Sequence, residues 1–501
     1  MSRVGAGFVY WLLLALPASA GSLHQPDSQS FDGLHALLAN AEVPAALQAA
    51  AALVKRHPQE LAPRLHQVFC LFWGYLMDRD RQDLAQRGEQ EAVTLREQAE
   101  SLLHSEPRDP LLLYCAGMAA QYEARFKGLR GAWWGAISAA RASHGLLQDA
   151  IRADPGLADA HCGLAIYDIA MDVLPGYFKI LRAFLFLPAG NLGRGMKGLR
   201  EAASSATCQR LEARVMLAAF TLEFENRAEE SRKWVDQLVR DYPDNPWFQL
   251  WQASQLQLLD RNPSSALKQL ARVDELLARR DSPFDRELVA RVAVERACAH
   301  LELGESADAE QALGRLLDSG VERPFVVVGT ARWLLARLFL MRGATAAARE
   351  QVQQITSIDE LKDLARGYLR HPPAPRWGEL DRRAALARHR AAGGNQRAAE
   401  AALAEADRRL GANPVTATQR ASWRLAAGDW QGARALVARW REDSLEDAPA
   451  WIQAELFQLA ARIAELEGQR DQARKLYDRV LERAAPAENL YARARLARAP
   501  H

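Results

Sequence analysis

Three arginines stand at equivalent positions in the second half of the chain, each six residues before a glycine. They are Arg337, Arg388 and Arg462, and the same column also holds Cys298 and Ser422. A guanidinium binds a carboxylate through two parallel hydrogen bonds, so this column could hold an acidic segment or a terminal carboxylate of a partner. The alternative is chance in an arginine-rich chain, because charged helix faces are usually solvated.

Other residues that could do chemistry lack the necessary context. The segment 190–198 is rich in glycine but has no Gly-Lys-Ser or Gly-Lys-Thr ending and no expected strand before it. Its glycines are better explained by a chain turn and a close approach of helices. We therefore expect no nucleotide and no other cofactor.

No catalytic or metal-binding pattern stands out either. His161 and the cysteine after it are the one adjacent His/Cys pair, and no HExxH, paired-Cys or Gly-x-Ser-x-Gly pattern is present. Glu223 and Glu225 lie in an ordinary helix end. We expect no catalytic residue and no metal ligand. An enzyme remains an alternative, and it would require ionisable groups to converge near His161, Asp168 and Asp172.

The glycines that follow the arginine column by six residues belong to a spaced triple, Ala-x6-Gly-x4-Ala, that occurs five times. Each glycine separates two amphipathic helical patterns, and each alanine marks a point where those helices must approach closely. Such a unit cannot bury its apolar face alone, so the units must stack. The triples are Ala297/Gly304/Ala309, Ala336/Gly343/Ala348, Ala387/Gly394/Ala399, Ala421/Gly428/Ala433 and Ala461/Gly468/Ala473.

Helical periodicity extends over almost the whole chain, in segments of roughly 10 to 16 residues that Gly, Pro, Asn or Asp interrupt. Alternation typical of strands is essentially missing. The sequence therefore predicts an all-α fold of stacked antiparallel helix pairs that form a superhelical solenoid.

Small residues at the helix crossings, the turn and a later apolar stripe resemble the tetratricopeptide-repeat (TPR) family. The spacing between turn glycines varies from 34 residues (Gly394 to Gly428) to 51 residues (Gly343 to Gly394). The resemblance implies a right-handed superhelix whose concave groove holds peptides; another type of helical solenoid is the alternative. Upstream residues also fit: Ala46, Ala50, Leu53 and Pro58; Ser143, Leu147, Ala150 and Pro155; Ala219, Ser231, Val235, Leu238 and Pro243.

A proline cluster at residues 371–376 interrupts the helical pattern, since it cannot be helical throughout. We expect it to link an array over residues 21–370 to a second array over residues 377–501.

One unit departs from the others. Its first small residue, Gly163, and its best candidate for a turn glycine, Gly193, lie 30 residues apart where seven is usual. The insert near residues 170–192 is the most apolar stretch after the N-terminus, and its candidate contact residues are Phe178, Leu181, Phe184 and Leu185. A helix that is apolar all round is buried, in its own protein or elsewhere.

The insert therefore has three interpretations. It is part of the protein's own core, a docking element for a partner, or a contact with a membrane surface. Its length and flanking prolines argue against a membrane span. The block 172–202 also resembles the central segment of the tetratricopeptide-repeat protein 39 family, in which an apolar, proline-bounded stretch leads into a Gly-Leu helix. No function is carried over from that likeness.

The N-terminus has the pattern of a signal peptide over residues 1–20. Arg3 is basic, Phe8–Leu16 is apolar, and Ala18-Ser19-Ala20 forms a cleavage site. We expect export to the periplasm or outer envelope and no transmembrane span in the mature chain; an uncleaved anchor is the alternative.

Composition excludes some classes of protein. The 501 residues carry a formal net charge of +2 and are 49% hydrophobic. The chain is therefore globular, and it lacks the strongly basic balance of a dedicated nucleic-acid binder. Five widely separated cysteines are expected to be buried and free, although a disulfide stays open. The tryptophan pairs Trp133/Trp134, Trp247/Trp251 and Trp423/Trp430 fit packing better than ligand binding, with one exposed anchor still open.

These observations predict an exported, non-catalytic scaffold that binds a protein or peptide, in envelope assembly or secretion. The alternatives are a peripheral adaptor that docks on a membrane through the insert, and an enzyme with a buried polar site beside it.

Overall fold

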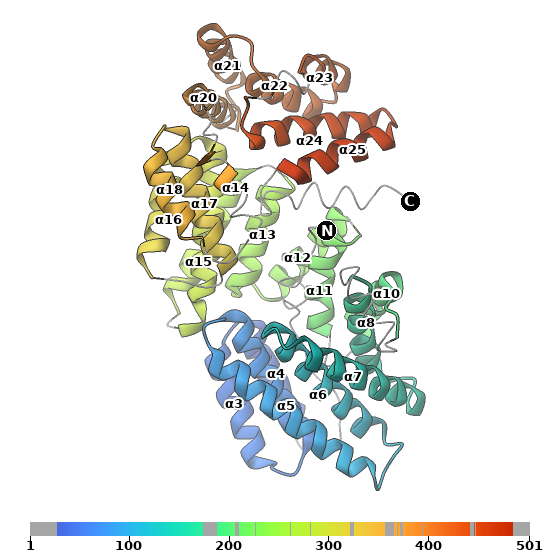
Figure 1. Ribbon diagram of the computed structural model, residues 1–501. Coiled ribbons are helices and arrows are strands. Elements are labelled where there is room, and N and C mark those ends of the chain that lie inside the picture. Colours follow the sequence, from blue (N-terminus) through green and yellow to red (C-terminus); the bar gives the residue numbers. More distant parts are fainter. Residues whose placement is uncertain are drawn as a thin grey trace. The chain divides into compact units, whose positions relative to one another are not determined.

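The computed structural model describes residues 28–173, 188–205, 210–225, 227–260, 262–280, 282–320, 325–355, 365–367, 369–370, 374–392, 394–440, 445 and 447–483. Every regular element within these ranges is a helix (Figure 1). The predicted all-α class is confirmed. The expected signal peptide, residues 1–20, lies outside the described residues and stays a prediction.

The described chain divides into two compact units. Unit 1 holds the described residues up to Thr221 together with Glu229–Phe248 and Leu276–Leu288. The described residues between these stretches and after Leu288 form unit 2. A helix that crosses from one unit to the other belongs to the unit that holds most of it.

The helices pair along the chain as hairpins. Those of unit 1 are α2 (Ser28–Ala39), α3 (Val43–Arg56), α4 (Leu61–Met77), α5 (Gln82–Leu103), α6 (Pro110–Leu129), α7 (Trp133–Ala153), α8 (Ala158–Val173), α10 (Leu192–Ser205), α11 (Arg210–Glu223), α12 (Ala228–Asp241) and the short 3-10 helix η1 (Pro283–Asp285). Those of unit 2 are α13 (Pro246–Leu258), α14 (Pro263–Ala278), α15 (Arg286–Leu303), α16 (Ser306–Asp318), α17 (Phe325–Met341), α18 (Thr345–Gln353), α20 (Pro375–Ala392), α21 (Gln396–Leu410), α22 (Pro414–Ala426), α23 (Trp430–Val437), α24 (Ala450–Leu466) and α25 (Arg470–Arg483).

The five Ala-Gly-Ala triples form the turns and crossings that the sequence predicts. The five turn glycines have φ between 76° and 83°, a region that only glycine adopts without strain. All ten alanines are at most 3% exposed, as a close approach of the paired helices requires. The upstream small and apolar residues Ala46, Ala50, Leu53, Ser143, Leu147, Ala150, Ser231, Val235 and Leu238 are at most 2% exposed. The TPR-like hairpins are confirmed.

Each of these turns ends its first helix in the same way. The glycine N–H donates to the carbonyl three residues back, and the next N–H donates to the carbonyl five residues back. In the turn at Gly304, Gly304 N lies 3.1 Å from Leu301 O, and Glu305 N lies 2.9 Å from His300 O. This is the Schellman motif, which satisfies carbonyls that the helix end leaves without partners.

The first turn of unit 1 uses the same motif with alanine in place of glycine. Ala41 has φ 60°, which strains an L residue by about 1–2 kcal/mol. Its surroundings compensate: Arg280 donates to the carbonyls of Asn40 and Ala41, and Asn245 Nδ2 donates to Ala39 O at 2.8 Å. The last segments of unit 1 therefore hold its first hairpin.

Helix α4 is enclosed within unit 1. Every residue from Leu65 to Met77 is buried, which explains a sequence that is apolar all round rather than on one face. Phe72 packs against Tyr122 and Phe126 of α6, with ring centroids 5.5 and 5.3 Å apart. On another side, Gly74 lies against the ring of Phe284 in η1. Aromatic side chains fill the interior here.

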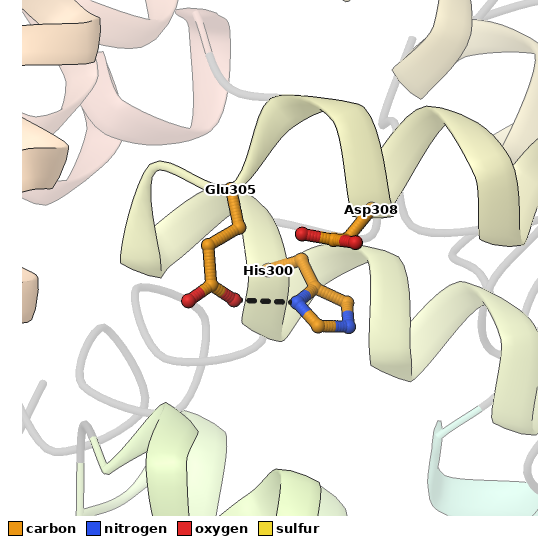
Figure 2. Close-up of side chains that lie close together, drawn as sticks. All are labelled: His300, Glu305 and Asp308. Carbon is orange, nitrogen blue, oxygen red and sulfur yellow. Dashed lines mark hydrogen bonds and ion pairs between the residues drawn. The ribbon is translucent and has the colours of Figure 1, made fainter.

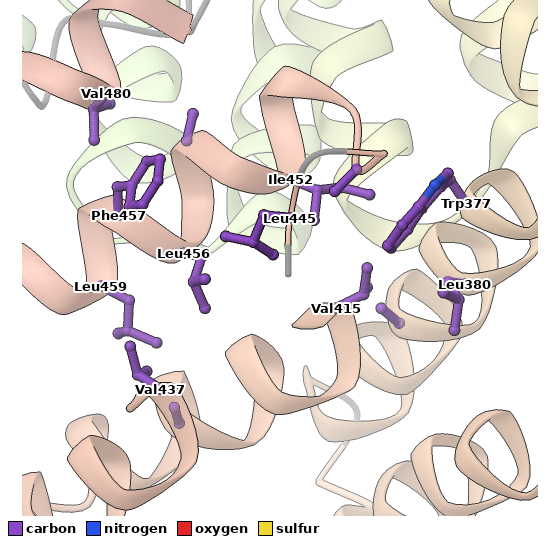
Figure 3. Packing of buried hydrophobic residues seen from close by; sticks show 14 of the residues in the cluster. Trp377, Leu380, Val415, Val437, Leu445, Ile452, Leu456, Phe457, Leu459 and Val480 are labelled. Carbon is purple, nitrogen blue, oxygen red and sulfur yellow. The ribbon is translucent and has the colours of Figure 1, made fainter. Parts of the chain in front are cut away.

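One cluster of buried apolar residues in unit 2 extends from Trp333 to Val480 and has members on both sides of the proline cluster. Figure 3 shows part of it, from Trp377 to Val480. Pro375 is the first residue of α20, where its missing N–H costs no helical hydrogen bond. Gly378 then lets α20 approach the carbonyl of Met341, which lies 2.1 Å from where a Cβ would be. The division between the two units does not fall at residues 371–376, and the boundary expected there stays a prediction. Residues 371–373 lie outside the described residues.

Gly304 and Gly343 have similar φ values but different surroundings, so replacing each with alanine distinguishes backbone strain from overpacking. A Cβ on Gly343 would have no atom within 4 Å, whereas a Cβ on Gly304 would lie 2.8 Å from the Cβ of Ala385. Gly343→Ala should lower the free energy of unfolding by about 1 kcal/mol through its positive φ alone. Gly304→Ala should lower it by about 3 kcal/mol, because overpacking adds to the strain. Urea unfolding of both variants measures this, and equal losses would contradict the contact with α20.

Two histidines of unit 1, His35 and His66, are buried among aromatic rings. Their ring centroids lie 5.0 Å apart, and His66 stacks on Phe31 at 4.3 Å. Removal from water lowers the pKa of His66 from 6.5 to about 4, against a hydrogen bond to Ala62 O. Burial, and secondarily the nearby His66, also lowers the pKa of His35 well below its ordinary value. Both rings are therefore neutral in the folded protein near neutral pH.

Acid should destabilise unit 1 through these rings. Below pH 6.5 His66 takes up a proton in the unfolded chain, whereas in the folded protein it stays neutral until about pH 4. Its contribution to the free energy of unfolding is therefore fully present above pH 6.5 and is lost as the pH falls from 6.5 to about 4. His66 alone should account for about 3 kcal/mol. Urea unfolding at pH 7 and pH 4.5 measures the loss. His66→Phe should reduce it, whereas His104→Ala, at an exposed histidine, should leave it unchanged.

Candidate functional site

The arginine column lies on the first helices of successive hairpins in unit 2. Arg388 of α20 donates from Nε to Glu302 O in α15 at 3.0 Å and from Nη1 to Gln419 Oε1 in α22 at 3.3 Å. Arg337 Nη2 of α17 lies 3.9 Å from Asp381 Oδ2 in α20. Arg462 is half-buried on α24. Two of the three guanidinium groups thus connect neighbouring helices, and binding of a partner by this column stays a prediction.

The candidate contact residues of the insert are not among the described residues. Phe178, Leu181, Phe184 and Leu185 lie outside the described residues, which stop at Val173 and resume at Pro188. The three interpretations of the insert stay predictions. Within the part of the chain that the structure describes, no helix combines the length and the apolarity that crossing a membrane requires.

The chain that follows the insert lies against α8, the helix that precedes it. Tyr167 donates its hydroxyl to Pro188 O at 3.2 Å, and Leu192 N donates to Asp172 Oδ2 at 3.1 Å. A Cβ on Gly190 would lie 2.2 Å from the carbonyl oxygen of Asp168, so only glycine fits there. The chain therefore leaves α8 at its C-terminal end and returns to the same half of that helix.

The glycines after the insert serve helix packing, as the sequence predicts. Cβ atoms on Gly195 and Gly198 would lie 2.5 Å from Ile169 Cγ1 and 2.8 Å from Ala165 Cβ, both in α8. The prediction of Gly193 as a turn glycine is wrong, because α10 begins at Leu192 and contains it. The change of direction falls earlier, before the helix.

The residues on which an enzyme would depend have separate partners. His161 is exposed, and its Nε2 lies 3.1 Å from the carbonyl oxygen of Pro155. Asp168 is buried and accepts two hydrogen bonds from Arg194 of α10. Asp172 accepts the N–H of Leu192. Both carboxylates fasten α10 to α8, and the enzyme alternative stays a prediction.

A deeply buried ion pair among the described residues of unit 1 also has a structural role. Arg125 Nη1 of α6 lies 2.7 Å from Glu212 Oε1 of α11, and the side chains are 8% and 0% exposed. The guanidinium lies over the rings of Phe72 and Tyr122. Burial raises the pKa of Glu212, and the charge of Arg125 opposes the rise. The pair joins two first helices inside a packed interior.

The tryptophan pairs differ in exposure. Trp133 and Trp134 are 39% and 66% exposed at the start of α7, next to Gly131, whose φ is 78°. Trp247, Trp251, Trp423 and Trp430 are half-buried. Residues 130–134 are all exposed, and we call them the tryptophan corner. Of the two readings left open by the sequence, packing fits the other pairs and an exposed anchor fits Trp134.

The turn between α15 and α16 brings together three side chains that the sequence analysis did not select. His300, Glu305 and Asp308 each offer one ligand atom, and these atoms lie within 4.8 Å of one another (Figure 2). His300 Nδ1 lies 2.7 Å from Glu305 Oε2. The spacing His-x4-Glu-x2-Asp around Gly304 could have identified them, but only once the position of the turn was known.

No family model matches the sequence, and no curated protein matches it. Among solved structures, the chain is similar to a human IFIT1 dimer with m7Gppp-AAAA, at 14% identity over 95% of this chain and 92% of that chain, with a TM-score of 0.34. It is also similar to yeast Tom70, at 13% identity over 92% and 93%, with a TM-score of 0.34. A tetratricopeptide repeat protein from Parabacteroides merdae matches at 14% identity over 57% of this chain and 98% of that chain, with a TM-score of 0.24. The likeness is to stacked helical hairpins.

Replacement of Arg388 tests its structural role. Arg388→Ala should lower the free energy of unfolding by about 2 kcal/mol, because a charged donor to the carbonyl of Glu302 is lost. Arg408→Ala removes a guanidinium that is 74% exposed and should change stability by less than about 0.5 kcal/mol. Urea unfolding measures both. If the two variants behave alike, Arg388 does not hold the helices and is available to a partner.

Proposed function

We propose that this chain is an exported, non-catalytic scaffold that binds another polypeptide in the bacterial envelope. Repeated helical hairpins offer extended surfaces to which successive repeats contribute equivalent positions. The arginine column is such a set of positions, and the N-terminal pattern of residues 1–20 supports export.

The observation that carries the proposal is the tryptophan corner. Two adjacent tryptophans expose large apolar rings at the end of a hairpin, where burial in the core of their own protein would be the ordinary outcome. Tryptophan is among the residues that most often dominate binding energy at protein interfaces. Trp134, at 66% exposure, has most of its surface available for a partner.

The surroundings of the corner fit the rim of an interface. Arg130 Nη1 pairs with Glu89 Oε2 at 2.6 Å, and Lys127 Nζ pairs with Glu123 Oε1 at 2.5 Å. Arg130 is itself part of the tryptophan corner, and Lys127 precedes the corner in the chain. Interfaces commonly combine an apolar, aromatic centre with a polar border of this kind.

Site-specific photo-crosslinking tests the proposal. The full chain, with its first 20 residues, is produced in a Gram-negative host with a photoreactive phenylalanine analogue at position 134. We expect a processed chain that begins at Gly21 and a discrete adduct with one polypeptide, because the exposed indole marks the contact. Unlabelled wild-type chain in excess should suppress the adduct, and W134A should not.

Position 466 supplies the matched control, since Leu466 is another large apolar side chain with 61% exposure. The same analogue there should give no discrete adduct. Equal labelling from both positions, or competition by W134A as strong as by wild type, would contradict a specific contact at the corner. A chain that instead floats with lipid vesicles and yields no polypeptide adduct would support the membrane-adaptor alternative.

A further inference from the structure

We propose that the turn between α15 and α16 is a zinc site, formed by His300, Glu305 and Asp308 (Figure 2). The histidine lies in the last turn of α15, the glutamate directly after Gly304, and the aspartate in the first turn of α16. His300 and Glu305 are 18% and 32% exposed, and Asp308 is exposed.

The donor set suits zinc. One imidazole nitrogen and two carboxylates supply two negative charges, which balance a divalent cation. Zn²⁺ binds His, Asp and Glu at about 2.0–2.2 Å, and sites with three protein ligands leave a fourth position for water. Imidazole favours zinc over magnesium or calcium, which prefer oxygen ligands alone.

The geometry requires only small changes. Ligand atoms around tetrahedral zinc stand about 3.4 Å apart, given bonds of about 2.1 Å. His300 Nδ1 and Glu305 Oε2 are 2.7 Å apart, so this pair opens slightly as the metal replaces the proton that it shares. The ligand atoms of the three residues all lie within 4.8 Å of one another. Asp308 is exposed at the start of α16, so rotation of its side chain brings its carboxylate to the distance that zinc requires.

The main chain of the turn holds the donors in place. Glu305 N donates to His300 O at 2.9 Å, so the backbones of two ligands are bonded directly. Gly304 packs on Ala385, and Arg388 donates to the neighbouring carbonyl of Glu302. A site on such a fixed frame loses little freedom when the metal binds.

The fold of the turn does not itself require these side chains. The same pair of backbone hydrogen bonds forms at Gly343, Gly394, Gly428 and Gly468. The residues at the three equivalent positions there are Phe339, Ala344 and Ala347; Arg390, Asn395 and Ala398; Arg424, Asp429 and Gly432; Ala464, Gln469 and Gln472. None of these sets contains a histidine, so the group at α15–α16 is particular to one hairpin.

Isothermal titration with ZnCl₂ tests the site in the full mature chain, after treatment with a chelator and gel filtration. We expect one zinc per chain at this site and a rise in the unfolding temperature on saturation, because the metal would join α15 to α16. Titration with MgCl₂ should give no comparable signal. Cobalt(II) in place of zinc should give the visible absorption of a four-coordinate site.

Single replacements identify the ligands. His300→Ala and Asp308→Asn should each weaken zinc binding at least about tenfold, since loss of even an outer hydrogen-bond partner has an effect of that size. Asp308 is exposed, so D308N keeps the test valid if H300A folds poorly. His57→Ala is the matched control, because His57 Nδ1 lies 3.0 Å from Glu60 Oε1 in a two-residue pair. Zinc binding that H300A and D308N leave unchanged, or that H57A abolishes, would overturn the proposal.

Discussion

Close contact between paired helices at two small residues is the constraint on which the rest of the structure depends. At a crossing such as Ala297 against Ala309, both residues are fully buried, and any larger side chain would separate the helices. The positive φ of the turn glycine then sets the direction in which the second helix returns. The arginine column and the α15–α16 turn both inherit their positions from this geometry.

Local signals made the hairpins predictable from the sequence. Small residues and turn glycines act within about a dozen residues, so their spacing alone predicts the crossing. The boundary at the proline cluster stays a prediction, because a local pattern does not show whether the core continues past it. Pro375 at the first position of α20 is compatible with an apolar cluster that has members on both sides. The division into units depends on distant residues such as Asn245 and Arg280, which no local pattern could indicate. Exposure of Trp134 was equally hidden, because periodicity does not fix which side of a helix start faces water.

Burial decides how an arginine is used in this molecule. Arg125 is enclosed with Glu212, and removal of either partner would leave an uncompensated charge in an apolar interior. Arg388 differs, because it is half-buried and bonded to a carbonyl oxygen and an amide rather than to a carboxylate. Because neutral acceptors bind a guanidinium less strongly than a carboxylate does, an acidic ligand could compete for it. A role of Arg388 in holding neighbouring helices together is therefore compatible with a role in binding an acidic partner.

The bonds that hold the strained turn at Ala41 set an order of folding. Their donors, Asn245 and Arg280, follow in the chain 206 and 240 residues after their acceptors. A ribosome that synthesises the chain from its N-terminus thus produces the first hairpin long before the residues that complete it. Closing so long a loop is entropically costly and slow. The two alanines of each triple in unit 2, such as Ala297 and Ala309, are only 12 residues apart in the chain. We therefore expect unit 1 to fold as a whole and only after Arg280 has been synthesised, and unit 2 to fold one hairpin at a time.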